Sequence, residues 1–201
     1  AKYTGPSNKL FRNYGVTDLS NRKLVSSLRQ TASGQHGAAR KKLSDYAIHL
    51  NEKQKIRLTY LVSEKQFAKY YNTAARKKGV TGTILLQLLE SRLDNVVFRM
   101  GLAMTRRESR QLVVHGHFNV NGKRVDIPSY RIKVGDVISL RENSKKSVKF
   151  KEIIETTAGR VTPTWLDVNK DEQSAKVIRM PVKEDLDYEI EEHLIVELYS
   201  K

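Results

Sequence analysis

The chain has 201 residues, enough to bury a hydrophobic core in one large domain or two small ones. It carries 37 Lys and Arg against 22 Asp and Glu, a formal net charge of +15 and a pI near 9.9. This balance favours a polyanionic partner and is unusual for a soluble metabolic enzyme. The chain has no cysteine, which excludes disulfides, thiolate nucleophiles and cysteine-based zinc sites.

A membrane surface is also a polyanion, but the sequence carries no signal for a membrane segment. Residues 1–15 lack the apolar core of a signal peptide. No run in the chain approaches the roughly 18 apolar residues that a membrane span requires. We therefore expect a soluble, intracellular protein that has no membrane partner.

The charge is distributed unevenly along the chain. The formal net charge is +7 over residues 1–45, +5 over 46–91, +7 over 92–158 and −4 over 159–201. A solvated surface is the simplest explanation of any single cluster, but it does not explain a gradient along the whole chain. The gradient predicts one face that meets nucleic acid and a C-terminal part that meets something else.

Residues 1–43 form the first segment. They are poor in aliphatic side chains and contain several glycines and a proline. A compact core is not expected in such a segment. We predict a basic N-terminal arm that is ordered mainly by its partner.

Residues 44–91 carry helical signals. Capping boxes that begin at Asn51 and at Ser63 predict two helix starts. Three basic residues precede Gly79, as in the cationic last turn and the terminating glycine of a helix. A later apolar stripe is broken near Ser91, so further helices are expected, and all of them must pack on one another.

Thr105 opens the next predicted helix, because Glu108 completes a capping box with it, and the helix ends before Gly116. At 100° per residue, four polar side chains share one arc of about 140°. They are Arg106, Arg107, Arg110 and Gln111. Leu112 and Val113 lie on the opposite side, so we expect a polar outer face.

A short sheet follows this helix. The segments 117–120 and 123–127 are typical of two antiparallel strands, and Asn121-Gly122 is typical of the tight turn between them. Pro128 ends the second strand, and residues 134–138 predict a turn that enters a further strand. The predicted unit is therefore two helices on a small, bent sheet.

Distinctive short motifs run through this unit. They are Arg92-Leu93-Asp94-Asn95-Val96-Val97, Gly101-Leu102-Ala103, Thr105-Arg106-Arg107, Arg110-Gln111, His115-Gly116-His117, Asn121-Gly122-Lys123, Ile127-Pro128-Ser129-Tyr130 and Gly135-Asp136. They resemble the small RNA-binding module that is named after the fourth protein of the small ribosomal subunit. Related modules occur in pseudouridine synthases, in a heat-shock RNA-binding protein and in some aminoacyl-tRNA synthetases. The module alone therefore implies RNA binding and no more.

The flanking segments extend the resemblance to the bacterial ribosomal protein itself. These segments are Ser33-Gly34-Gln35-His36-Gly37, Leu43-Ser44-Asp45-Tyr46, Asn51-Glu52-Lys53-Gln54-Lys55, Glu64-Lys65-Gln66-Phe67 and Leu194-Ile195-Val196-Glu197-Leu198-Tyr199. The resemblance thus covers essentially the whole chain. Some members of that family carry an N-terminal cysteine cluster that binds zinc, and this chain lacks it.

The resemblance implies an α+β fold in which the module is inserted into a mainly helical domain. The expected parts are the basic arm at 1–43, a discontinuous helical domain at 44–91 plus 159–201, and the module at 92–158. The module is expected to hold two helices on a short, bent antiparallel sheet.

The resemblance also implies a function. Relatives are structural constituents of the small ribosomal subunit that bind 16S rRNA at a multi-helix junction of its 5′ domain, nucleate assembly and contribute to translational accuracy. The implied location is the cytoplasmic small subunit of a bacterial or organellar ribosome. The implied partners are 16S rRNA, neighbouring proteins (notably the fifth small-subunit protein) and mRNA where it enters the subunit. No cofactor, metal or small-molecule substrate is expected.

Duplex RNA hides its base edges in a deep major groove, so a rigid protein recognises phosphate positions, 2′-hydroxyls and junction shape. Arginine can fork onto two phosphate oxygens, and amide or imidazole groups can donate to sugar or phosphate. The side chains predicted to bind rRNA on these grounds are Lys9, Arg12, Gln35, His36, Arg40, Lys41, Lys42, Lys53, Lys55, Arg57, Arg106, Arg107, Arg110, Gln111, His115, His117, Asn121, Lys123, Arg124 and Arg131. For His117, a purely structural role within its strand stays open as an alternative.

Three acidic residues of the tail, Glu184, Asp185 and Asp187, are predicted to face away from RNA because phosphate would repel them. The resemblance offers the fifth small-subunit protein as their partner. A solvated acidic surface is the alternative, because an exposed ion pair typically contributes less than about 1 kcal/mol.

Three other functions fit parts of the sequence only. Arg92-Leu93-Asp94 matches the catalytic tripeptide of one pseudouridine synthase group, but the Thr-Ser-Gly that should follow is replaced by residues 97–99. Two histidines at 115 and 117 could ligate a metal, yet no third ligand is evident. A free RNA-binding chaperone fits the charge but leaves the arm and the acidic tail unexplained. We therefore expect no enzyme.

Overall fold

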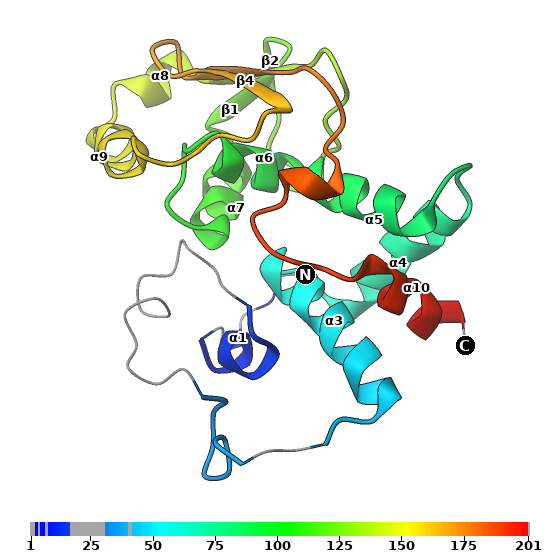
Figure 1. Ribbon diagram of the computed structural model, residues 1–201. Coiled ribbons are helices and arrows are strands. Elements are labelled where there is room, and N and C mark those ends of the chain that lie inside the picture. The colour runs from blue at the N-terminus through cyan, green and yellow to red at the C-terminus, as the bar shows by residue number, and fades with distance from the viewer. Residues whose placement is uncertain (1–2, 4, 7, 17–30, 40–41, 201) are drawn as a thin grey trace. The chain divides into compact units, whose positions relative to one another are not determined.

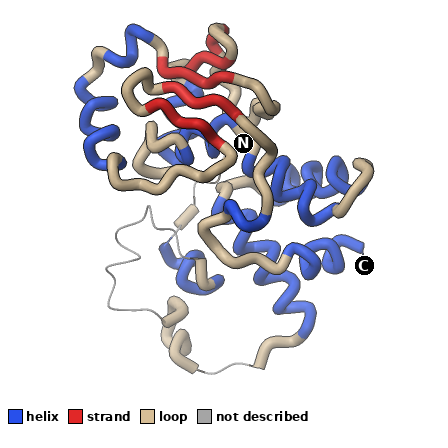
Figure 2. Tube along the Cα trace, turned by 45° about the horizontal axis from the view of Figure 1, so that its top comes forward, coloured by secondary structure: helices blue, strands red, loops and turns tan. Residues whose placement is uncertain are grey.

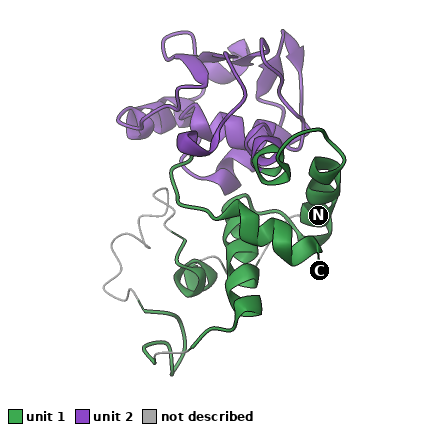
Figure 3. Cartoon of the chain, turned by 45° about the vertical axis from the view of Figure 1, so that its right-hand side comes forward, with its two compact units in different colours: residues 1–85, 186–201 green, residues 86–185 purple. Residues whose placement is uncertain are grey.

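The computed structural model describes residues 3, 5–6, 8–16, 31–39 and 42–200 (Figure 1). The chain divides into two compact units (Figure 3). Unit 1 comprises residues 1–85 and 186–201, and unit 2 comprises residues 86–185. The predicted α+β fold class is confirmed, because unit 1 is helical and unit 2 contains an antiparallel sheet.

The described part of unit 1 is built from helices that pack through aromatic and aliphatic side chains. They are α1 (Asn8–Tyr14), α3 (Asp45–Thr59), α4 (Glu64–Ala75), α5 (Thr81–Glu90), which continues into unit 2, and α10 (Glu192–Ser200). Helix α4 begins directly after Ser63, as predicted.

Helix α3 begins earlier than the sequence predicted. Ser44 is its N-cap, since the Ser44 Oγ accepts a hydrogen bond from the Ala47 N–H at 3.3 Å. Asn51, the predicted start, lies inside the helix. A cap motif inside a longer helix is not selected when an earlier cap with an acidic residue in the first turn, here Asp45, is available.

The N-terminal arm is also more structured than predicted. Helix α1 packs on α3, and Phe11, Val16 and Leu58 form a small buried cluster. Gly15 adopts a positive φ of 63° after the helix, which turns the chain so that Val16 meets Phe11. The prediction that residues 1–43 contain no core is therefore wrong for residues 8–16.

The C-terminal helix α10 packs on α3, far from it in sequence. The ring of Tyr199 stacks on that of Tyr71, with 4.5 Å between their centroids. Further along the returning segment, the hydroxyl of Tyr188 donates to that of Tyr60 at 2.5 Å. These contacts tie the end of the chain into unit 1.

Unit 2 consists of helices packed against a five-stranded antiparallel sheet of order β2-β1-β3-β5-β4 (Figure 2). The strands are β1 (Phe118–Val120), β2 (Lys123–Arg124), β3 (Val137–Leu140), β4 (Leu166–Asn169) and β5 (Ser174–Val177). The helices are α6 (Leu93–Arg99), α7 (Arg106–Val114), α8 (Glu142–Lys145) and α9 (Val148–Thr157), followed by the 3-10 turn η1 (Lys183–Asp185). Helices α6 and α7 lie on one side of the sheet in Figure 1.

The core of unit 2 lies between this sheet and the helices. Trp165, Phe118, Phe150 and Ile138 are among its fully buried side chains. The predicted β1–β2 hairpin is present, and Asn121 and Gly122 both adopt positive φ, at 50° and 78°. Two positive φ values are typical of the tight turn that suits the right-handed twist of paired strands.

The sheet is larger than the predicted module. Strand β5 pairs with β3, with Ile138 opposite Ala175, and β4 pairs with β5. Residues 159–185 therefore lie in unit 2, whereas the sequence had placed them with the helical domain. The physical reason is that β3 would otherwise end the sheet as an edge with unpaired backbone groups, and the β4–β5 hairpin satisfies them.

No helix in the described ranges is long and apolar enough to cross a membrane.

Candidate nucleic-acid interface

Helix α7 presents the central part of the candidate interface. Its N-terminus is fixed by the predicted capping box, because the Thr105 Oγ1 accepts from the Glu108 N–H at 3.2 Å and the Glu108 carboxylate accepts from the Met104 N–H at 2.8 Å. Arg107 and Gln111 are exposed on the outer face of this helix. The two predicted binding residues are thus accessible to a ligand.

Arg106 differs from the prediction that it would bind phosphate. Its side chain is buried, with the residue only 7% exposed. The Nε of Arg106 donates to the Asn95 Oδ1 at 3.2 Å, and the guanidinium lies 4.4 Å from the centroid of the Phe98 ring. These contacts give Arg106 a structural role in joining α7 to α6. The predicted polar face of α7 therefore does not include Arg106. This residue lies on the buried face of the helix, together with Ser109, Leu112 and Val113.

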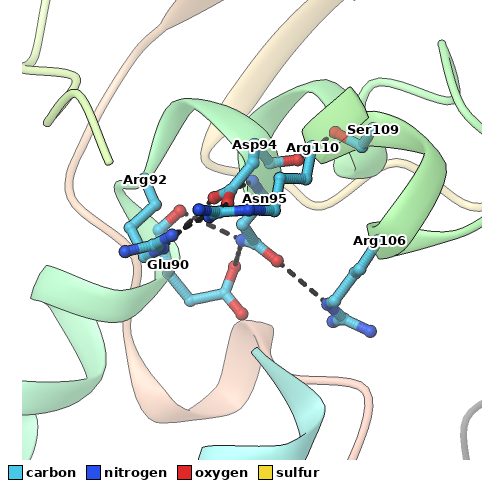
Figure 4. Close-up of polar contacts among 7 residues, drawn as sticks. All are labelled: Glu90, Arg92, Asp94, Asn95, Arg106, Ser109 and Arg110. Atoms are coloured by element: carbon cyan, nitrogen blue, oxygen red, sulfur yellow. Dashed lines mark hydrogen bonds and ion pairs between the residues drawn. The ribbon is translucent and has the colours of Figure 1, made fainter. Parts of the chain in front are cut away.

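Arg110 lies between the buried and the exposed faces of α7. Its side chain is 27% exposed, and its Nη1 is 3.3 Å from the Oδ2 of Asp94. Figure 4 shows this contact beside the ion pair of Arg92 with the same carboxylate. Arg110 is therefore partly accessible and also anchored at its inner side.

The loop that follows α7 gathers several basic side chains around Gly116. The guanidinium of Arg124 lies against the Cα of Gly116 so closely that a side chain there would collide with it. From another direction, the Nη1 of Arg141 donates to the Gly116 carbonyl at 3.1 Å. His115 and Arg124 are exposed. Two predicted binding residues, His115 at the end of α7 and Arg124 on β2, thus lie close together at Gly116.

Sequence reasoning missed Arg141 and Lys149 at this place. Lys149 lies in the first turn of α9, and its Nζ is 3.5 Å from the Glu108 carboxylate of α7. The available signal was the cluster of four lysines at 145–151, just after the third strand. Their position next to α7 depends on how α9 packs on the core, which no local pattern reveals.

His117 occupies the centre of this basic group. Its Nδ1 lies 2.9 Å from the Ser144 Oγ, and its ring packs edge-on against Phe150 at a centroid distance of 5.3 Å. Burial lowers the pKa of His117, and the positive charges of His115, Arg141, Lys149 and Arg124 lower it further. His117 is therefore mainly neutral near pH 7 and acts as a hydrogen-bonding residue within the fold.

The β1–β2 hairpin divides into an accessible and a structural part. Lys123 is exposed. The amide of Asn121 instead stabilises the turn, because its Nδ2 donates to Asp136 at 2.8 Å and its Oδ1 accepts from the Val137 N–H at 2.9 Å. Asn121 was predicted to contact RNA, but its side-chain amide is engaged on both sides.

Three predicted cations of α3 are engaged within unit 1. The Nζ of Lys53 is 2.9 Å from Glu64, and Arg57 is 3.6 Å from the same carboxylate. The Nζ of Lys55 donates to Glu52 at 2.5 Å. Lys53 is also buried, so these side chains are committed to the fold rather than presented to a ligand.

The remaining predicted contacts lie in the arm and beside α6. Lys9, Gln35, His36, Lys42 and Arg131 are exposed, and Arg12 is half-buried in α1. Arg40 and Lys41 lie outside the described residues.

The acidic residues of the tail are not equivalent. Glu184 and Asp187 are exposed. The side chain of Asp185 is only 7% exposed and accepts from both terminal nitrogens of Arg179 at 2.7 Å. Asp185 also accepts from the Val182 N–H at 2.8 Å, so its carboxylate, unlike those of Glu184 and Asp187, is buried and engaged within unit 2.

The described residues contain no group of three or more His, Asp or Glu side chains that could hold a metal ion. His115 and His117 lie with their ring centroids 6.1 Å apart, without a third ligand from the described chain.

Two families of known proteins match consecutive segments within residues 2–138. Residues 2–90 match the family described as Ribosomal protein S4/S9 N-terminal domain, and residues 91–138 match the S4 domain. The fold and its basic loop cluster therefore define an RNA-binding protein of the S4-domain class.

Full-length relatives make the assignment specific. Small ribosomal subunit protein uS4 of Acetivibrio thermocellus is 54% identical over 207 residues, which covers 100% of both chains. The uS4 protein of Clostridioides difficile is 49% identical over 211 residues and also covers 100% of both chains. Protein uS4A of Alkaliphilus oremlandii is 54% identical over 179 residues, 89% of this chain and 86% of the relative. The chain belongs to the uS4 family of small ribosomal subunit proteins, which are structural proteins and not enzymes.

Proposed function

We propose that this protein is a primary binder of 16S rRNA that nucleates assembly of the 5′ domain of the small subunit at a multi-helix junction. The observation that carries the proposal is the pair of Arg124 and Arg141 at Gly116, together with Lys149 beside Glu108 of α7. Arginine and lysine fixed on a rigid scaffold recognise the positions of phosphates rather than base edges, as folded RNA requires.

Binding to a transcript of the 16S 5′ domain tests this proposal. The chain is expected to bind the intact junction in preference to a transcript in which the junction helices are unpaired. In a reconstitution, omission of the chain is expected to delay the binding of later proteins to the 5′ domain. Equal affinity for the two transcripts would instead favour a free RNA-binding chaperone.

A pair of matched variants locates the contact on the protein. Arg124→Ala removes a cation of the Gly116 group and is expected to lower rRNA affinity and to reduce the salt slope by about one unit. Lys176→Ala removes an exposed cation of β5 in the same unit and serves as the control. Filter binding at several salt concentrations separates them. Equal losses in both variants would show that overall charge, and not this group, sets the affinity.

The proposal extends to the acidic residues and to translational accuracy. Glu184 and Asp187 are exposed carboxylates that phosphate would repel, so they suit a protein neighbour such as the fifth small-subunit protein. The double variant Glu184→Lys, Asp187→Lys is expected to keep or slightly raise rRNA affinity while it raises miscoding on assembled ribosomes. Loss of rRNA binding by the folded variant would contradict this orientation.

A further inference from the structure

We propose that Asp94 is a positioning residue that holds Arg110 ready for contact with an RNA phosphate. This inference deepens the proposed function and rests on it. It also gives a role to the Arg92-Leu93-Asp94 tripeptide, which RNA binding alone leaves unexplained. Asp94 lies at the start of α6, and Arg110 lies on α7 (Figure 4).

The carboxylate of Asp94 is itself rigidly held. Arg92 donates to it through two nitrogens, Nε to Oδ1 at 3.1 Å and Nη2 to Oδ2 at 2.8 Å. The Asn95 N–H donates to the Oδ1 at 3.0 Å. The Asp94 backbone N–H donates to the Pro128 carbonyl at 3.2 Å, which fixes the residue to the loop before Arg131. The carboxylate therefore has little freedom to follow a moving partner.

Helix α7 is bonded to the same two residues at the start of α6, Asp94 and Asn95. The Ser109 Oγ donates to the Asp94 carbonyl oxygen, and Arg106 donates to the neighbouring Asn95. The backbone of Arg110 is thus held by its neighbours, and Asp94 adds the remaining constraint on its side chain. Within the described residues, the Asp94 carboxylate is the one hydrogen-bonding partner of the Arg110 guanidinium.

The geometry leaves Arg110 able to bind a second anion. A guanidinium carries five N–H donors in a planar fork, and Asp94 engages one nitrogen at 3.3 Å. The Arg110 side chain is 27% exposed, whereas that of Arg92 is 5% exposed. On the same helix, the exposed Arg107 and Gln111 flank it. Arg110 is therefore partly exposed, and its contact with Asp94 removes part of its rotamer freedom.

A positioning role and simple electrostatics predict opposite effects of Asp94→Asn on RNA affinity. Asp94→Asn removes a negative charge close to bound phosphate, so Coulomb attraction alone would strengthen RNA binding. If Asp94 acts by ordering Arg110, the Arg110 side chain is free to move in the variant. RNA binding then has to immobilise this long side chain, and the lost entropy weakens binding. That cost corresponds to about two- to tenfold weaker binding.

A double-variant cycle on the full chain tests the proposal. Affinity for the 16S 5′-domain transcript is measured for Asp94→Asn, Arg110→Ala and the combination, after thermal melting shows that each is folded. We expect Asp94→Asn to weaken binding about two- to tenfold when Arg110 is present and to have no weakening effect in the Arg110→Ala background. Asp126→Asn, which removes an exposed charge of the same unit, is the control and should not weaken binding.

Arg110→Lys supplies a test that does not depend on Asp94, since it keeps the charge but loses the fork. It should keep the salt slope and weaken binding two- to tenfold. Tighter binding of Asp94→Asn, or equal weakening with and without Arg110, would overturn the positioning role. Unchanged affinity of Arg110→Ala, while Arg124→Ala still weakens binding, would overturn it and leave the proposed function intact. Loss of the junction preference in the unsubstituted chain would instead refute the proposed function.

Discussion

Two consecutive arginines of α7 have different physical roles. Arg106 is buried against the ring of Phe98 and bonded to Asn95, whereas Arg107 is exposed on the outer face. A substitution of the first acts on the folded state, because it leaves a buried acceptor without its donor. A substitution of the second removes an exposed cation, so it is expected to act mainly on RNA binding.

We therefore expect Arg106→Ala to lower the free energy of unfolding by about 1–3 kcal/mol. Arg107→Ala, the matched control, should change it by less than about 0.5 kcal/mol and should lower rRNA affinity instead. Denaturant unfolding and filter binding of the two variants measure both quantities. Equal stability of the two variants would contradict the structural role of Arg106.

His117 offers a test through pH. Its pKa is lowered by burial and by the surrounding cations, so the unfolded chain binds this proton more readily than the folded one. The stability of the folded state should therefore decrease as the pH falls below the unfolded value near 6.5. In His117→Asn this part of the pH dependence should be absent. An NMR titration that gives His117 a pKa above 6.5 in the free protein would refute the assignment.

At the scale of elements, local chemistry predicted some features and long-range pairing decided others. The start of α7 at Thr105 and the Asn121-Gly122 hairpin depend on adjacent residues, and both are present as predicted. The start of α3 was misplaced because two competing caps lie in one continuous helix. The β4–β5 hairpin was missed because its strands have only four residues each and are stabilised by the sheet, in which β5 pairs with the distant β3 and β4 pairs with β5.

One aromatic residue of α10, Tyr199, makes two kinds of contact with the rest of unit 1. Tyr199 stacks on Tyr71, and its hydroxyl donates to the Glu64 carboxylate at 2.8 Å. Burial and the neighbouring Glu64 raise the pKa of Tyr199. Burial tends to raise the pKa of Glu64, but hydrogen bonds from Lys53 and Tyr199 outweigh it, so the pKa is lowered. Glu64 thus favours folding above its unfolded pKa near 4.5, and this contribution is lost as the pH falls through the lowered value.

Tyr199→Ala should destabilise unit 1 by about 0.5–1.5 kcal/mol beyond the loss of buried area, because the stacked pair is removed. Tyr199→Phe is the control that keeps the stacking and removes only the hydroxyl. Hydrogen exchange of α10 amides should accelerate strongly in the first variant and little in the second. Similar exchange in both would show that the hydrogen bond, and not the ring, holds the helix.

On the scale of the whole molecule, the charge gradient and the motifs predicted the class of protein, and the family comparisons agree with it. They did not separate cations that bind a ligand from cations that stabilise the fold. Lys53 and Arg57 lie in basic sequence, yet both meet Glu64 of α4, which helix packing brings close, whereas Lys55 meets Glu52 three residues earlier in α3. Only tertiary structure reveals that difference, because the pairing of charges depends on which faces are buried.

The central claim is that fixed cations of this chain bind the phosphates of a folded rRNA junction. Its most direct test is the affinity for the 16S 5′-domain transcript between 50 and 200 mM salt. If the chain neutralises about 6–10 phosphates, affinity should fall by roughly 10³- to 10⁵-fold over that range. A nearly flat dependence on salt would contradict the claim.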